Sequence, residues 1–412
     1  MYREADIKKY AELIVRTGVN VQKNQIAVVR TPVECYEFSR LITEQAFLAG
    51  AKDVITIYSD SADQRLRFTH ATTETLCDVP SWSVDRMMKY ANEGACFISI
   101  TGDDPDAFEG LDQIKIGEAK KAVSKANAPY YDKIDKSENQ WTVVAYPGKK
   151  WSAKVFPGIP AEEAQKKLWD SILSAVRITG KDNPVKEWAD HSTTLASHCR
   201  FLNESGIVTM KIKNSLGTDL EIGLAEDYIW AGGSEKTVDG VEFQANMPTE
   251  EVFSMPHRER VNGIVYASLP LSYQGVMVED FYFRFENGKV VDYGAKKGKE
   301  ALTQLLGTDE GSSYLGELAL VAYETPIRQT GILFYNTLFD ENAACHLALG
   351  SAYAMTMKGG PEMTKDERTA KGCNDSVSHV DFMFGTADLA ITGIKADGTE
   401  IPVFVNGGWV NK

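Results

Sequence analysis

The sequence contains no apolar run approaching the roughly 20 residues that a membrane-spanning helix needs. Its charged beginning, Met-Tyr-Arg-Glu-Ala-Asp, also lacks the apolar stretch of a secretory signal. Basic residues are in deficit, since 44 lysines and arginines against 58 aspartates and glutamates give a formal net charge of −14. Such a chain repels phosphate backbones and anionic lipid. We therefore expect neither nucleic acid nor a membrane as a partner.

Cysteine is sparse, and its spacing excludes a disulfide framework. No CxxC pair occurs, and the cysteines are scattered singly along the chain. This usage predicts reduced thiols in a cytoplasmic protein. The cysteines are Cys35, Cys77, Cys96, Cys199, Cys345 and Cys373.

Four motifs of well-known enzyme classes are missing as well. No GxGxxG follows the first predicted strand, and no GxxxxGK[ST] occurs, so neither nucleotide-binding loop is present. The absence of GxSxG excludes a serine-hydrolase elbow, and the absence of HExxH excludes a helix-borne zinc site. The acidic stretch 101–106 is expected to be a solvated helix start. We interpret the N-terminal part as a scaffold or substrate wall.

The length of 412 residues predicts two or three domains, and the apolar and charged fractions of 43% and 25% are typical of globular proteins. In the first part, strand patterns alternate with helical ones, which predicts an α/β domain with a mostly parallel sheet. We expect a helix to begin at Thr31-Pro32 and to end at Gly50. The predicted strands are 25–30, 54–58, 96–100 and 141–146, and helices are predicted at 7–14 and 115–126.

From about residue 183 the pattern becomes α+β with antiparallel pairing. A long helix is predicted at 185–203, and Asn287-Gly288 is a strong hairpin signal. We therefore expect two domains, 1–182 as the α/β scaffold and 183–412 as the α+β domain. The strands predicted in the second domain are 207–212, 220–224, 261–269 and 281–285.

His379 and Asp381 are predicted to lie on one face of a strand. Residues i and i+2 of a strand point to the same side, while Val380 and Phe382 point into the core. A carboxylate in such a buried strand is costly unless it is paired or bound to a cation. A structural Asp-His pair and a pair of metal ligands both fit this pattern.

His346 lies in an alanine- and leucine-rich stretch that we interpret as a buried helix. Tyr353, seven residues on, would share its helical face. The two could form a satisfied core pair or contribute to a site. Two further histidines, His191 and His198, lie seven residues apart on the predicted helix 185–203, and we expect them to be solvated or packed.

Three glutamates stand beside apolar runs. Glu250 and Glu251 follow a proline and precede Val252-Phe253, and in a strand they would face opposite ways. Glu317 opens the apolar run 318–321. Each could also be a solvated strand end.

Taken together, these residues have the chemistry of a metal centre. Three carboxylates, two imidazoles and a phenol suit Zn²⁺, Co²⁺ or Mn²⁺ better than a thiolate-binding metal. They are sufficient for two ions about 3.5–4 Å apart that share a carboxylate, hold a hydroxide and polarise a carbonyl. Glu250 could then serve as the general base. The set comprises Glu251, Glu317, His346, Tyr353, His379 and Asp381.

Several long motifs resemble the metallo-aminopeptidases of the aminopeptidase T, aminopeptidase S and PepS type, and they occur in the same order. The stretches that carry the resemblance are Asn-Met-Pro-Thr-Glu-Glu-Val-Phe (246–253), Leu-Gly-Glu-Leu-Ala-Leu-Val (315–321), Phe-Tyr-Asn-Thr-Leu-Phe-Asp-Glu-Asn-Ala-Ala-Cys-His (334–346) and His-Val-Asp-Phe-Met (379–383). Weaker likeness extends over nearly the whole chain.

The resemblance implies a homodimeric, two-domain exopeptidase that acts on peptides with two divalent metals in its C-terminal domain. The family's ligands fall on Glu251, Glu317, His346, Tyr353, His379 and Asp381. Family spacing favours Glu251 as the ligand and leaves Glu250 as the base, and Tyr353 also counts as a catalytic residue. Two alternatives are another metal-dependent amidase or carboxypeptidase at the same site, and a non-catalytic α/β binding protein whose acids and histidines form core ion pairs.

Overall fold

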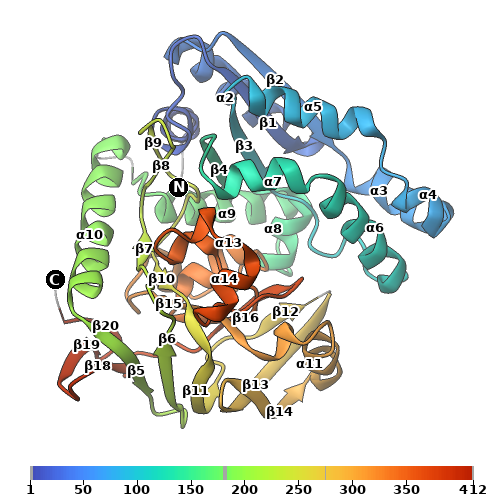
Figure 1. Cartoon of the computed structure of the whole chain (residues 1–412). Helices are drawn as coiled ribbons and strands as arrows, with labels where there is room; N and C mark the ends of the chain where they lie inside the picture. The colour runs from blue at the N-terminus through green and yellow to red at the C-terminus, as the bar shows by residue number, and fades with distance from the viewer. Residues whose placement is uncertain (1–2, 180–182, 274, 411–412) are drawn as a thin grey trace. The chain divides into compact units, whose positions relative to one another are not determined.

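The computed structural model describes residues 3–179, 183–273 and 275–410, and within these it divides into two compact units (Figure 1). The first unit comprises Met1–Asp190 and Ser234–Pro248, and the second comprises His191–Gly233 and Thr249–Lys412. The domain boundary predicted near residue 182 falls on residues outside this described part. Among the described helices, none combines the length and the apolar character needed to cross a bilayer.

The first unit is built on a parallel sheet, as the sequence predicts. In its described residues, the strand order β2-β1-β3-β4 places β1 between two strands parallel to it. The strands are β1 (Ile26–Pro32), β2 (Asp53–Ser59), β3 (Cys96–Thr101) and β4 (Trp141–Ala145). A short antiparallel pair, β8 (Glu235–Lys236) with β9 (Glu242–Phe243), belongs to the same unit.

Helices cover both faces of the parallel sheet (Figure 1). Val28 and Phe97 pack against helices α5 and α7 on one face. On the other face, α1, α2 and α9 pack against one another through the aromatic rings of Tyr10, Phe38 and Trp169. The helices are α1 (Glu4–Leu13), α2 (Tyr36–Ala49), α3 (Ser61–His70), α4 (Thr73–Cys77), α5 (Ser81–Asn92), α6 (Gln113–Ala126), α7 (Ala128–Asp135), α8 (Lys149–Val155) and α9 (Ala161–Ala175).

The predicted helix start at Thr31-Pro32 is wrong. Strand β1 continues through Pro32, because its parallel pairing with β2 extends to Ser59. Helix α2 begins only at Tyr36, after a short 3-10 turn. Its predicted end is confirmed, since Gly50 adopts φ +101° as the C-cap.

The second unit contains two antiparallel sheets, which confirms the predicted change from parallel to antiparallel strand pairing. The large sheet has the order β12-β13-β11-β6-β5-β18-β19-β20, with β14 paired to β13, and the small sheet has the order β17-β16-β15-β10-β7. The large sheet comprises β5 (Ile207–Lys213), β6 (Asp219–Leu224), β11 (Pro256–Tyr266), β12 (Leu271–Tyr273), β13 (Val276–Glu286), β14 (Lys289–Lys297), β18 (Ala390–Lys395), β19 (Glu400–Val405) and β20 (Gly408–Trp409). The small sheet comprises β7 (Ala231–Gly232), β10 (Val252–Ser254), β15 (Leu315–Leu320), β16 (His346–Gly350) and β17 (His379–Met383). The helices are α10 (Pro184–Glu204), which belongs to this unit from His191 on, α11 (Lys299–Leu306), α12 (Pro326–Gln329), α13 (Thr337–Asp340) and α14 (Lys365–Ala370).

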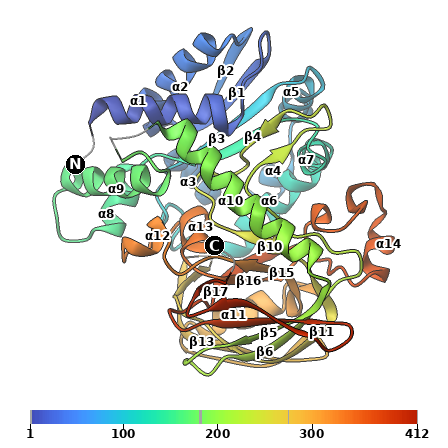
Figure 2. The ribbon, with the colours of Figure 1, turned by 90° about the vertical axis from the view of Figure 1, so that its left-hand side faces the viewer.

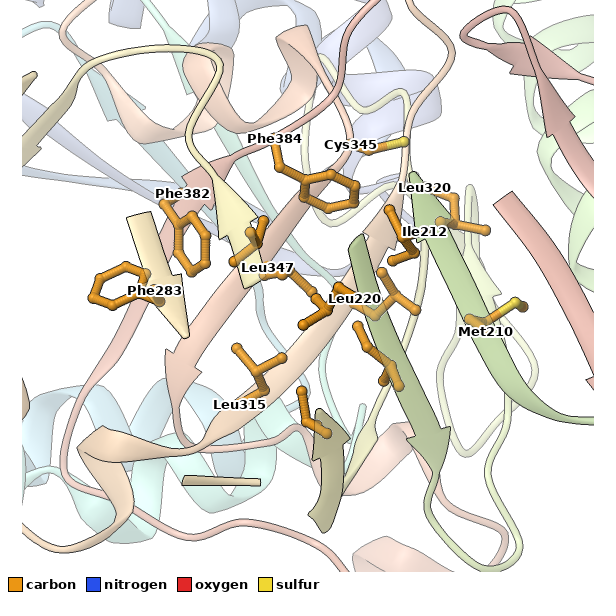
Figure 3. Close-up of a cluster of buried hydrophobic side chains, with 14 of the residues drawn as sticks. Met210, Ile212, Leu220, Phe283, Leu315, Leu320, Cys345, Leu347, Phe382 and Phe384 are labelled. Carbon is orange, nitrogen blue, oxygen red and sulfur yellow. The ribbon is translucent and has the colours of Figure 1, made fainter. Parts of the chain in front are cut away.

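The two sheets of this unit lie one above the other and enclose its core (Figure 2). Leu315 and Leu347 of the small sheet face Ile212 and Leu220 of the large sheet in this cluster (Figure 3). The rings of Phe283 and Phe382 meet across the layers, with centroids 5.1 Å apart. One face of the small sheet is therefore apolar and buried, and every second residue of its strands is directed to the opposite face.

Asn287-Gly288 forms the predicted hairpin between β13 and β14. Both residues have positive φ, +47° and +84°, as the mirror-image turn of a tight hairpin requires. A Cβ on Gly288 would lie 1.7 Å from the carbonyl oxygen of Arg258, so this position excludes any side chain.

We expect Gly288→Ala to lower the free energy of unfolding by more than about 1 kcal/mol, because backbone strain and a backbone clash add. Gly398→Ala is the matched control, since Gly398 has the same φ of +84° but open space around its Cα. The comparison is made from urea unfolding midpoints. Equal losses in the two variants would show that the contact with Arg258 has no effect.

Candidate metal centre

Four of the six candidate ligands lie on the face of the small sheet that is turned away from the core. In β15, Leu318 and Leu320 enter the core, so Glu317 points to the other side. The same alternation turns His346 outward from β16, and His379 and Asp381 outward from β17. The core packing of each strand thereby sets the direction of its polar residues.

Strand register brings these residues together in space. Ala348 of β16 is opposite Glu317 on one side and Asp381 on the other. The small alanine side chain leaves room above the sheet between the two carboxylates. Gly350, opposite His379, has no side chain at all.

Within the described part of the chain, two groups of side chains have ligand atoms close enough to hold a metal ion. One group is Glu251, Glu317 and His346, and the other is Glu317, His379 and Asp381, with all ligand atoms of a group within 4.8 Å of one another. Glu317 belongs to both. Its Oε1 lies 3.3 Å from Nε2 of His346 and its Oε2 lies 3.7 Å from Nε2 of His379. The two oxygens of one carboxylate therefore face the two groups.

The remaining two carboxylates each face one of the imidazoles. Oε2 of Glu251 lies 3.1 Å from Nε2 of His346, and Oδ1 of Asp381 lies 3.3 Å from Nε2 of His379. Glu251 and Glu317 are 8% and 5% exposed, and His346 is 1% exposed. Such a buried set of acids needs compensating positive charge.

Both imidazoles are oriented by backbone carbonyls. Nδ1 of His346 is 3.1 Å from the carbonyl oxygen of Ala344, and Nδ1 of His379 is 2.7 Å from that of Ser351. These contacts assign the proton to Nδ1 and leave the Nε2 lone pair directed at the carboxylates. Carbonyl-held imidazoles with a free Nε2 are the usual form of histidine metal ligands. The donor set and its arrangement fit divalent metals of the zinc, cobalt and manganese type.

Without metal, the two imidazoles of the centre hold protons more tightly than a free histidine does. Burial alone would lower the pKa of His379, but hydrogen bonding to Asp381 and the charge of Glu317 outweigh it and raise the pKa to about 9. Burial likewise opposes protonation of His346, yet hydrogen bonds to Glu251 and Glu317 raise its pKa well above the usual value. A metal ion must displace these protons, so its affinity falls as the solution becomes more acidic.

Tyr353 is brought to the same place, from a loop. Its ring centroid lies 4.7 Å from that of His379 and 6.2 Å from that of Phe253. Burial and the charges of nearby carboxylates, Glu317 and Asp381 first among them, raise the pKa of its phenol well above the ordinary value. Tyr353 is 46% exposed, so it borders on solvent.

The structure corrects two details of the predicted site. His346 opens a strand instead of lying in a helix, so Tyr353 reaches the centre through the loop after β16 and not along a helical face. Glu250 and Glu251 lie in an irregular segment just before β10. They nevertheless meet different histidines, since Oε2 of Glu250 lies 3.8 Å from Nε2 of His191.

Two polar residues that the sequence did not point to hold this irregular segment. Nε2 of His191 lies 2.8 Å from the carbonyl oxygen of Thr249. Oδ1 of the fully buried Asn342 accepts a hydrogen bond from the backbone N–H of Glu250, at 2.7 Å. The other helical histidine, His198, stacks on Trp409 at 4.1 Å, as expected of a packed residue. The only sequence signal for His191 was its position on the predicted helix.

A further carboxylate, Glu341, was also missed. It lies in the 3-10 turn Glu341–Ala343, which packs against β17. Burial, then the charges of Glu251 and Asp381, raise its pKa well above the ordinary value. Its only signal in the sequence was its place within the motif 334–346.

The comparisons with known proteins agree with this chemistry. The family profile described as thermophilic metalloprotease (M29) matches residues 3–409. The chain belongs to this metalloprotease family. Aminopeptidase AmpS of Bacillus subtilis is 44% identical over 403 residues, and aminopeptidase T of Thermus aquaticus is 41% identical over 405 residues; each alignment covers 98% of both chains.

Solved structures give the same result at the level of the fold. AmpT from Thermus thermophilus superposes with a TM-score of 0.93 at 40% identity and covers 99% of both chains. A dihydroxypyridine dioxygenase from Pseudomonas putida has a TM-score of 0.56 at 10% identity, which shows a shared fold alone. The predicted family is thus confirmed, and with it the prediction that the chain is a metallo-aminopeptidase.

All six cysteines lie in described segments and are free thiols, as predicted. Cys345, beside His346, is fully buried and exchanges hydrogen bonds with the backbone of Val321 at 3.2 Å. Burial raises the pKa of its thiol to about 12. It therefore serves the packing of β15 against β16 and supplies no thiolate.

Proposed function

We propose that this metallo-aminopeptidase releases single N-terminal residues from peptides at a two-metal centre. The candidate ligands are Glu251, Glu317, His346, Tyr353, His379 and Asp381. The observation that carries the proposal is the position of Glu317, whose two oxygens face two separate ligand groups. A carboxylate placed in this way is the usual bridge of a dinuclear site.

When bound, two divalent ions supply an activated water and polarise the scissile carbonyl. The side chains provide the rest. Glu250 accepts a proton as general base and delivers it to the leaving amine, since it stands beside a ligand without belonging to either group. His191 and Asn342 fix the backbone of the segment that carries it. Tyr353 completes the site as a ligand and catalytic group at its solvent side.

Two assays test the proposal. Dialysis against a chelator is expected to reduce release of N-terminal residues at least about a thousandfold, because Lewis-acid activation is worth several kcal/mol, and Zn²⁺, Co²⁺ or Mn²⁺ should restore it. An acetylated version of the same peptide is expected to remain intact. Cleavage of the acetylated peptide would instead indicate an endopeptidase, amidase or carboxypeptidase, and hydrolysis that survives full metal removal would contradict the metal role altogether.

The dimeric state that the resemblance implies and the cytoplasmic location that the cysteine usage predicts stay predictions, as does the choice of metal. The metal is best determined by anomalous scattering from protein that has not been treated with chelator. The same measurement counts the ions and identifies their ligands.

A further inference from the structure

Strand β17 forms one edge of the small sheet and carries two of the candidate ligands. Among the described strands it pairs with β16 alone, and the sheet ends there. Helix α10 lies against the opposite edge, β7, because Sγ of Cys199 is 4.0 Å from the carbonyl oxygen of Gly232 and a Cβ on Gly233 would lie 3.3 Å from Cβ of Leu195. The edge left for a further strand is therefore that of β17.

The strand register shows which main-chain groups of β17 face away from β16. The carbonyl oxygen of Ser378 accepts the N–H of Ser351, and the N–H of Phe384 donates to the carbonyl oxygen of Cys345. In an antiparallel ladder, residues that bond to the neighbouring strand alternate with residues whose N–H and C=O face away from it. The even-numbered residues of β17 therefore bond to β16, and the odd-numbered ones direct their main-chain groups outward. The outward set comprises His379, Asp381 and Met383.

Only the last of these three residues has a main-chain partner on the outer side. The carbonyl oxygen of Met383 accepts the N–H of Ser268, and the N–H of Asp381 bonds to its own carboxylate. In the described part of the chain, no hydrogen bond reaches the outward main-chain groups of His379 or the carbonyl oxygen of Asp381. Exposure agrees, since β17 is half-buried over its first three residues, whereas β15 and β16 are buried along their whole length.

The unpaired stretch is held in place at both ends. Before it, Asp309 accepts hydrogen bonds from the N–H of Val377 and the hydroxyl of Ser376, each at 2.7 Å. Beyond it, Ser268 bonds to the end of the strand. The strand also contains no proline or lysine, the residues that commonly block an exposed edge. A partner strand would thus meet a preorganised edge, which lowers the ordering cost of binding.

We propose that the peptide substrate binds as an additional antiparallel strand along β17, with its main chain hydrogen-bonded to His379 and Asp381. The inference rests on the proposed function, because the side chains of the same two residues belong to one of the ligand groups. Each residue directs its side chain to the metal centre and its main chain to the edge. A peptide whose first bond lies at the metals therefore has its following residues beside this edge.

The free groups determine the direction of the added strand and the spacing of its bonds. The free N–H is that of His379, and in an antiparallel pair one peptide residue uses both the N–H and the C=O of this residue. The peptide residue two positions away donates its own N–H to the carbonyl oxygen of Asp381. The residue between them directs its main chain outward. Because such a ladder uses groups that every residue except proline carries, the edge binds whichever sequence remains after each cleavage.

The first test removes single N–H groups from the substrate. In a hexapeptide of leucine followed by five alanines, each amide beyond the first is replaced in turn by an ester, which deletes one donor with little change of shape. At a position paired with β17, kcat/KM for release of leucine is expected to fall about 3- to 10-fold, the usual effect of losing one hydrogen bond. At the neighbouring positions it should change less than about twofold, so sensitive and insensitive positions alternate.

The second test locates the added strand on the protein. The probe is the same hexapeptide with its first amide reduced to a methyleneamino group, which the enzyme does not hydrolyse. In metal-loaded protein, hydrogen exchange at the N–H of His379 is expected to slow about tenfold or more when the probe binds. The N–H of Val380 is the matched control, because it faces β16 and should exchange at the same rate with and without the probe.

Three outcomes overturn the inference. Equal losses at every ester position, or no loss at any, contradict main-chain pairing. Alternating losses without slower exchange at His379 place the peptide on a different edge. Failure of the proposed function looks different, because the unmodified hexapeptide would then keep its leucine in the presence of metal.

Discussion

Glu317→Gln is expected to remove both metal ions and to lower peptide hydrolysis about a thousandfold or more. The oxygens of Glu317 face two histidines, His346 at 3.3 Å and His379 at 3.7 Å. Glutamine keeps the size of the side chain but has one oxygen and no charge, so it cannot serve both groups. Losing metal activation costs several kcal/mol of transition-state stabilisation, which gives this rate effect.

His379→Ala is the informative comparison, because His379 belongs to only one of the two groups. It should leave about one ion per chain, whereas Glu317→Gln should leave none. His198→Ala is the matched control, since His198 stacks on Trp409 and is in neither group. Elemental analysis of dialysed protein gives these ratios. If Glu317→Gln kept one ion, Glu317 would be a ligand of a single metal.

The sequence was most informative where a site residue lies in a strand whose apolar and polar residues clearly alternate. His379 and Asp381 are two apart in an otherwise apolar stretch, and the period of two already placed them on one face. Glu317 precedes a run that the structure buries completely. In both cases the core-facing residues determine the direction of the polar ones, so local pattern and tertiary position agree.

The stretch around His346 shows where local pattern fails. Short apolar runs rich in alanine and leucine fit a buried helix and a buried strand equally well. β16 lies between β15 and β17, and the hydrogen bonds to both neighbours make it a strand. That choice depends on chain segments more than 25 residues away, which no local window contains.

His191, Asn342 and Glu341 could not be predicted from the sequence. Each acts through a contact distant in the chain, such as that of His191 with Thr249 or of Asn342 with Glu250. The sequence shows that a polar residue stands in an apolar setting, but its partner is known only from the fold. The family motif 334–346 includes Asn342 and Glu341 without assigning either a role.

Glu250→Gln is expected to lower kcat about 10²- to 10⁴-fold while metal content and affinity for a hydroxamate stay near the wild-type values. This range is the usual contribution of a positioned general base. The segment around Glu250 is held through backbone atoms, the carbonyl oxygen of Thr249 and the N–H of Glu250 itself. Replacing the carboxylate by an amide leaves those two bonds in place and removes the proton acceptor.

The neighbouring position is the matched comparison for this variant. Glu251 contacts His346 at 3.1 Å and belongs to a ligand group, so Glu251→Gln should lose metal as well as activity. Metal analysis and single-turnover kinetics on the two variants therefore distinguish a base from a ligand between adjacent glutamates. If Glu250→Gln lost metal and Glu251→Gln kept it, the two roles would be exchanged. If Glu250→Gln kept full turnover, a different group would have to move the proton, and Glu341, fixed through Asn342 beside the same segment, would be the next to test.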